Sequence, residues 1–110
     1  MCEFKVYLNN TEILEDVVRV KYVDGKMELT TVLGEKKELE DAMIIQVDVS
    51  KERLEVIQNS MIGALLKFLR LYDKVIREQK YHEELECALD DIKAIGDSLV
   101  RKTWKNYVKR

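Results

Sequence analysis

Apolar and polar residues alternate along the first half of the chain with the period of β-strands. In the stretch EFKVYL, Phe4, Val6 and Leu8 stand at every second position, as in a strand with one buried face. Asp24-Gly25 predicts a tight hairpin, because both central residues of a type I′ turn need a positive φ. These patterns predict strands over residues 3–8, 18–23, 27–31, 36–39, 42–49 and 53–57.

So many short strands within residues 1–58 restrict the folds that this segment can adopt. An open sheet of short strands leaves unpaired edges in solvent, whereas closure into a barrel removes them. We therefore predict a small antiparallel β-barrel of the SH3 or Sm-like kind for residues 1–58. With the helices that follow it, the chain is expected to be an α+β protein.

The hydrophobic period changes to that of a helix at Asn59-Ser60, and either residue can cap a helix. An apolar stripe then follows at Met61, Leu65, Phe68, Leu69, Tyr72, Val75 and Ile76. After the polar stretch REQKYHEE comes a second stripe, out of phase with the first, at Leu85, Leu89, Ile92, Gly96, Leu99 and Thr103. The phase break favours a helical hairpin over residues 59–110, in which Gly96 lets the helices approach closely. The alternative is one long, bent helix that pairs with a second chain, because no Gly or Pro forces a break.

The composition is typical of a soluble globular domain. Of the 110 residues, 46% are apolar and 36% are charged, which supports both a core and a well-solvated surface. The longest apolar run, residues 61–66, is much shorter than the roughly 18 residues that span a bilayer. The first residues lack the apolar segment of a signal peptide. We therefore expect a cytoplasmic protein with no membrane contact and with both cysteines reduced.

Cys2, directly after the initiator methionine, is the first candidate for chemistry. The Met1 amine, the Cys2 amide nitrogen and the Cys2 thiolate can close two chelate rings around one metal ion. Such a planar set of nitrogen and sulfur donors suits a square-planar ion, Ni(II) or Cu(II), better than tetrahedral zinc. One chain supplies only three donors in this way, so a two-fold dimer that joins two Cys2 residues would complete the site.

Two other interpretations of Cys2 are open. It can be a small apolar residue at the start of a strand, with no chemical role. It can also be an N-terminal nucleophile, but Met1 blocks the α-amine that this mechanism needs. The chain contains a single histidine, no HExxH motif and no phosphate-binding Gly-rich loop, so we do not expect an enzyme.

The end of the chain combines basic and aromatic residues. The net charge of the whole chain is −2, yet the last ten residues, RKTWKNYVKR, hold five bases and no acid. This mixture suits phosphate contacts and base stacking, so RNA or an acidic protein is a candidate partner. The candidate contact residues are Arg101, Lys102, Trp104, Lys105, Tyr107 and Lys109. The same bases can instead complement the dipole of a helix, and the thirteen acids and eight bases of residues 1–58 would repel a nucleic-acid backbone.

A second group of metal-ligand types occurs in the stretch YHEELEC. On one continuous helix, His82 and Glu86 would share a face, and Glu83 and Cys87 would share another. The two faces lie about 100° apart, so all four side chains cannot converge on one ion. A solvated helix start, with acids near its positive end, is the simpler interpretation of this stretch.

The first 58 residues resemble the CooT-like family. The resemblance rests on Met1-Cys2-x-x-Lys5-Val6-x-Leu8, the Val17–Val20 strand, the Gly25 hairpin, the Leu29–Leu33 strand, and Ile45-x-Val47-Asp48 before Leu54–Ile57. Members are small archaeal and bacterial proteins associated with nickel delivery to carbon monoxide dehydrogenase. The resemblance implies an SH3-like barrel that dimerises and binds Ni(II) through Cys2, with Met1 contributing backbone donors. The family has also been labelled as predicted RNA-binding, and its typical members lack a helical extension like residues 59–110.

Together these features predict a nickel-binding accessory protein. We expect a homodimer that holds the metal with Cys2 of both subunits and assists the maturation of a nickel enzyme. The helical extension would strengthen the dimer or contact the client enzyme. The alternatives are an RNA-binding module that uses the basic and aromatic C-terminal helix, and a purely structural or protein-interaction domain.

Overall fold

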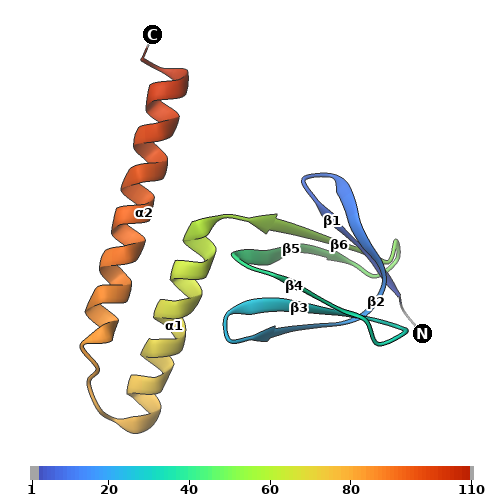
Figure 1. The fold of residues 1–110 in the computed structure, drawn as a ribbon, viewed down its shortest axis with the longest axis horizontal. Coiled ribbons are helices and arrows are strands. Elements are labelled where there is room, and N and C mark those ends of the chain that lie inside the picture. Colours follow the sequence, from blue (N-terminus) through green and yellow to red (C-terminus); the bar gives the residue numbers. More distant parts are fainter. Residues whose placement is uncertain (1–2, 110) are drawn as a thin grey trace. The chain divides into compact units, whose positions relative to one another are not determined.

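The computed structural model describes residues 3–109 and contains a six-stranded sheet followed by two helices (Figure 1). The chain divides into two compact units, one ending at Gly63 and the other beginning at Ala64. The strands are β1 (Phe4–Leu8), β2 (Thr11–Val23), β3 (Lys26–Thr31), β4 (Lys36–Leu39), β5 (Ala42–Asp48) and β6 (Arg53–Gln58). The helices are α1 (Ser60–Glu78) and α2 (Glu84–Tyr107). The predicted α+β class is confirmed.

The sheet is open, with the strand order β4-β3-β2-β1-β6-β5. All neighbouring strands are antiparallel except β1 and β6, which are parallel. The prediction of a closed, wholly antiparallel barrel is therefore not confirmed. Yet β4 and β5, the two edges, are joined by only residues 40 and 41, so the sheet must curl until its edges approach. The Tyr22 hydroxyl donates a hydrogen bond of 2.9 Å to the Ala42 carbonyl across this corner, but no ladder closes the sheet among the described strands.

The long strand β2 pairs with both β1 and β3 because it bends near its middle. Asp16 has a φ of 59°, and the register with β3 shifts between Val17 and Arg19. A bulge of this kind bends a strand and increases its twist. The sequence pattern predicted only residues 18–23 as a strand, because the adjacent acids Glu15 and Asp16 interrupt the alternation ahead of the bend.

The core of the first unit lies inside the curled sheet. Val6, Met27 and Leu29 are almost completely buried, as their alternation with polar residues predicts, and so is Val17, which precedes the predicted strand 18–23. Full burial of each such side chain stabilises the fold by about 1.5–3 kcal/mol. The remaining members of this core cluster are Leu39, Ala42, Leu54 and Val56.

Helix α1 begins where the sheet ends, and its first turn packs on the sheet unit. The Asn59 side chain accepts a hydrogen bond of 2.9 Å from the Met61 amide, so Asn59 is the N-cap. The Asn59 amide in turn donates to the Asp41 carbonyl at 2.8 Å. A Cβ atom on Gly63 would overlap the Asp41 carboxylate, so only glycine fits at this position without a shift. Ile62 is buried in the same turn.

The second unit is an antiparallel pair of helices, in which α2 follows α1 after residues 79–83 (Figure 1). The helical hairpin is therefore the correct prediction, and the alternative of one long helix is wrong. Gln79 ends α1 with a φ of 53°, a conformation that stops a helix without Gly or Pro. Ala88 of α2 is buried, and Leu85, Ile92, Ile95 and Leu99 on the same face are partly buried.

Candidate metal centre

Cys2 and Met1, the predicted metal ligands, lie outside the described residues. The residues that follow them, from Glu3 onward, show how the chain next to Cys2 is held. The described chain enters β1, which lies between β2 and β6 in the sheet. Near the start of β1, Phe4 pairs with Val17 of β2 and Lys5 pairs with Arg53 of β6. The strand that follows Cys2 is thus held on both sides from its first residues.

Glu52, in the turn between β5 and β6, holds the chain immediately after Cys2. One of its carboxylate oxygens accepts a hydrogen bond of 3.1 Å from the Glu3 amide. Its carbonyl oxygen accepts a second, of 2.9 Å, from the Lys5 amide. The φ of Glu52 is 50°, and this left-handed conformation belongs to the turn that presents both oxygens to β1. Glu52, fifty positions after Cys2 in the sequence, therefore fixes the backbone at Glu3, the residue that follows Cys2.

The turn that carries Glu52 is itself ordered by Asp48. The Asp48 carboxylate accepts hydrogen bonds from the Ser50 hydroxyl at 2.7 Å and from the Lys51 amide at 3.0 Å. The Ser50 hydrogen bond, followed by that of the Lys51 amide, holds the pKa of Asp48 below its usual value. The predicted strands 42–49 and 53–57 left residues 50–52 as a connection, but the sequence pattern did not indicate the Glu52 contact. Asp48 followed by Ser50 was the available signal, since an Asp that bonds the chain two or three residues later is a common turn former.

A hollow of about 420 Å³ opens beside these residues. The Arg53 guanidinium lies 3.8 Å from the centre of the Tyr7 ring and 3.3 Å from the Glu55 carboxylate, so its charge is already engaged. The hollow contains three acids and three bases, and its lining residues are Glu3, Lys5, Tyr7, Asp16, Lys51, Glu52 and Arg53. Within residues 3–109, no three His, Cys, Asp or Glu side chains are placed to hold a metal ion. A metal centre at this end of the sheet would therefore depend on Met1 and Cys2.

The YHEELEC stretch contains an exposed helix start with Glu84 and Glu86 in the first turn of α2, as its simpler interpretation predicts. Helix α2 begins at Glu84 with Glu83 as its N-cap, and His82 lies outside the helix. His82 instead contacts Glu78 of α1 at 2.9 Å, and this hydrogen bond lowers the pKa of Glu78. The Tyr81 hydroxyl donates to Glu86 at 2.6 Å, which raises the pKa of the Tyr81 phenol. These contacts tie the connection between the helices to both of them, and Cys87 is a free, exposed thiol beside them.

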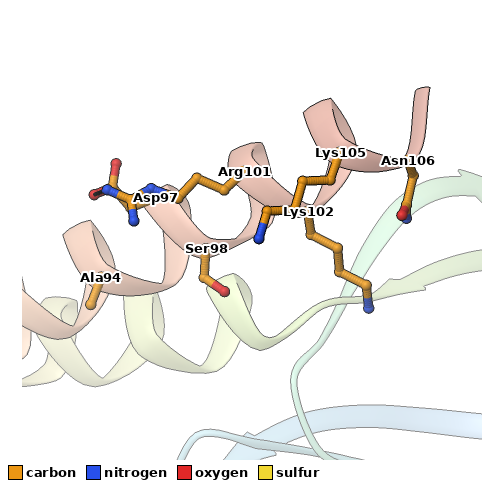
Figure 2. Close-up of a pocket in the computed structure, with 7 residues that line it drawn as sticks. All are labelled: Ala94, Asp97, Ser98, Arg101, Lys102, Lys105 and Asn106. Atoms are coloured by element: carbon orange, nitrogen blue, oxygen red, sulfur yellow. Dashed lines mark ion pairs between the residues drawn. The ribbon is translucent and has the colours of Figure 1, made fainter. Parts of the chain in front are cut away.

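The basic and aromatic residues of the C-terminal segment lie on two faces of α2. Arg101, Lys102 and Lys105 line a shallow groove together with Ala94, Asp97, Ser98 and Asn106 (Figure 2). Trp104 and Tyr107 belong to a second, apolar groove with Leu99, Val100, Thr103 and Val108. With 100° between successive residues of a helix, the centres of the two sets lie on opposite sides of α2. A protein that binds single-stranded RNA uses basic side chains for the phosphates and aromatic side chains for the nucleobases, and both must face the same RNA strand. The separation of the basic and aromatic residues of α2 therefore does not favour RNA binding.

The first unit is a small domain built on one curled six-stranded sheet, and a cysteine is its second residue. Small sheet domains of this class include a family whose sequence profile matches the chain. The sequence profile described as "CO dehydrogenase accessory protein CooT" matches residues 1–56, just over half of the chain. The chain therefore belongs to the CooT family, as its resemblance predicted.

Two further comparisons complete this result. A crystal structure described as a CooT of Carboxydothermus hydrogenoformans is 19% identical, with a TM-score of 0.49; the match covers 54% of this chain and all of that one. No curated protein matches the chain significantly. Neither helix of residues 3–109 is long and apolar enough to cross a membrane.

Proposed function

We propose that this protein is a homodimeric accessory protein that binds Ni(II) through Cys2 and delivers it to a nickel enzyme, without being an enzyme itself. Membership of a family described as accessory to CO dehydrogenase supports an accessory role and makes an enzyme of that kind the candidate client. The observation that carries the metal site is the double contact from Glu52 to Glu3 and Lys5, which fixes the chain next to Cys2.

The donor chemistry favours nickel over zinc. A thiolate with an adjacent amide nitrogen and terminal amine forms a planar set, which suits a d⁸ ion such as Ni(II). Each chain contributes at most three donors, or a single thiolate if the backbone does not ligate. Two copies related by a two-fold axis would place two Cys2 thiolates on one ion, and the cargo could then leave by ligand exchange to a client with more donors.

Titration of Ni(II) into the full chain, followed by calorimetry and by thiolate-to-nickel absorption, tests this proposal. Cys2→Ser should weaken binding by more than about tenfold and remove the absorption, because it deletes the strongest donor. The matched control is Cys87→Ser, which removes the exposed thiol of α2 and should leave both signals unchanged. Equal affinity in the wild type and Cys2→Ser would refute the Cys2 site.

A second variant separates the two ligand sets. Adding Gly-Ser before Met1 moves the free amine away while keeping both thiolates. If the amine ligates, this extension weakens Ni(II) binding; if only paired thiolates ligate, the affinity stays that of the wild type. A metal-to-chain ratio of one to two, measured in the same titration, is expected in either case.

A further inference from the structure

The groove on α2 that Figure 2 shows changes in character along its length, and we call it the basic groove. At one end, Ala94 and Ser98 lie one helical turn apart and give it a floor of two short side chains. At the other end lie the long side chains of Arg101, Lys102 and Lys105. Each of these five residues is three or four positions from another of them, so together they occupy one side of the helix. The groove has a volume of about 500 Å³, and α2 alone lines it.

The three bases of the groove have little to bind within the described chain. Asp97 lies 3.8 Å from Arg101, but the two side chains are 75% and 78% exposed, and an ion pair so open to solvent is weak. No carboxylate of residues 3–109 lies within ion-pair distance of Lys102 or Lys105. Like charges that are three or four positions apart on a helix also repel one another. The cluster is therefore a positive charge that an external anion would stabilise.

The helix dipole accounts for only part of this cluster. Bases stabilise the C-terminal end of a helix, but the effect is confined to about the last turn. Lys105 lies in the last turn of α2, which ends at Tyr107, whereas Arg101 and Lys102 lie further from that end. The dipole therefore does not explain why these two bases stand beside Lys105 on the same groove.

We propose that the basic groove binds an acidic segment of a partner protein, whose carboxylates pair with the three bases. The short side chains of Ala94 and Ser98 let the backbone of such a segment lie close to the helix. From Ala94 to Asn106 the groove follows about 18 Å of α2, the length of roughly five residues of extended chain or twelve residues of helix. The inference is independent of the nickel site, because every residue that it uses belongs to α2.

The lining of the groove favours the carboxylates of a protein over the phosphates of RNA. None of the lining residues is aromatic, and Trp104 and Tyr107 belong to the groove on the opposite side of α2, so nucleobases would find no ring to stack on. The thirteen acids and eight bases of residues 1–58 also repel a long polyanion. A short acidic segment, which needs only the groove, avoids most of this repulsion.

The first test uses a dye-labelled peptide of about ten glutamates, which is long enough to cover the groove. Fluorescence anisotropy measures its binding to the full chain. At about 50 mM salt we expect saturable binding that weakens as the salt rises to about 300 mM, because exposed ion pairs are screened. A uridine RNA of the same length should bind at least about threefold more weakly, because its bases gain no stacking contact.

Charge variants locate the binding site on α2. Lys102→Glu and Lys105→Glu should each weaken the binding of the glutamate peptide by about three- to thirtyfold, because each removes an attraction and adds a repulsion. Lys93→Glu is the matched control, since it makes the same change at an exposed position on another side of α2. It should change the affinity by less than about twofold. Circular dichroism and Ni(II) affinity should be those of the wild type in all three variants.

A second pair of variants tests the floor of the groove. Ser98→Leu changes no charge but fills the narrow end with a larger side chain, so it should weaken the binding of the glutamate peptide by about three- to tenfold. Ser98→Ala keeps the floor small and should bind the peptide like the wild type.

Each measurement has an outcome that would overturn the inference. No saturable binding of the glutamate peptide by the wild type up to about 1 mM, or equal binding by Lys102→Glu and Lys93→Glu, would show that the groove is not the site. RNA that binds more tightly than the peptide would assign the bases to a nucleic acid instead. Wild-type affinity in Ser98→Leu would show that the segment does not lie in the groove.

Discussion

The carboxylate of Glu52 accepts a hydrogen bond of 3.1 Å from the amide of Glu3, the residue that follows Cys2. The contact joins two residues that are 49 positions apart in the sequence, and it extends the pairing of β1 with β6 to the start of the described chain. It holds Glu3, the described residue next to the proposed nickel ligand. Its removal should therefore affect metal binding more than folding.

We expect Glu52→Ala to weaken Ni(II) binding by about two- to tenfold, the equivalent of one hydrogen bond of about 0.5–1.5 kcal/mol. The cause is greater freedom of the chain at Glu3, which the metal complex must then order. Calorimetric titration measures the effect, with Glu35→Ala, an exposed acid between β3 and β4, as the control for the lost charge. If both variants bind nickel like the wild type, the contact has no role in the site.

The close fit of Gly63 against Asp41 gives a prediction about the junction between the sheet and α1. Gly63→Ala should lower the free energy of unfolding by roughly 0.5–1 kcal/mol, because the new methyl group displaces the Asp41 carboxylate and this cost is partly offset by the higher helix propensity of alanine. Asp41→Gly removes that carboxylate at a position where φ is 55°, a conformation that glycine adopts readily. The double variant should therefore recover most of the loss in urea unfolding. A double variant as unstable as Gly63→Ala alone would show that the overlap is not the cause.

Local features of the fold could be predicted from the sequence, whereas the contacts between distant segments could not. The Asp24-Gly25 turn has positive φ at both residues, 53° and 79°, as its type I′ signature predicts. The end of α1 was placed only by a change of hydrophobic phase, because a left-handed Gln79 has no clear sequence signal. The parallel pairing of β1 with β6 joins segments about fifty residues apart, and no local pattern specifies it.

The candidate site divides in the same way. Cys2 could be singled out by its chemistry and its place in the chain, but the Glu52 contact beside it depends on the strand order of the sheet. The basic and aromatic residues of α2 were identified from composition, and their separation onto two faces follows from the helix geometry. The helix start in YHEELEC could be predicted, but the contact of His82 with Glu78 depends on the path of the chain between the helices, which helix periodicity alone does not reveal.

The N-cap of α1 is a single residue, although the sequence offered two candidates. We expect Asn59→Ala to lower the free energy of unfolding by about 1 kcal/mol, since its side chain accepts the Met61 amide at 2.9 Å. Ser60→Ala, one position inside the helix, should change it by less than about 0.5 kcal/mol. Urea unfolding followed by circular dichroism compares the two. Equal losses in both variants would contradict the assignment of Asn59 as the cap.

The hydrogen bond from Tyr22 to Ala42 leads to a prediction about alkaline pH. Partial burial raises the pKa of the Tyr22 phenol, outweighing a smaller lowering by a backbone hydrogen bond at Ile44. The folded state thus binds the phenol proton more tightly than the unfolded state, where the pKa is about 10. The stabilisation is complete below pH 10 and is lost as the pH rises through the higher folded value.

Tyr22→Phe separates this contribution from the titration of other groups. At neutral pH the variant should be less stable by roughly 0.5–1 kcal/mol, because the Ala42 carbonyl loses its donor at the corner where the sheet edges meet. Above pH 10 the wild type should lose stability more steeply, so the two urea midpoints should converge. Tyr81→Phe is the comparison variant, because the Tyr81 phenol also has a raised pKa, caused mainly by its hydrogen bond to Glu86, but lies in the exposed connection between the helices. A constant difference between Tyr22→Phe and wild type from pH 8 to about pH 11 would rule out a contribution from the Tyr22 proton.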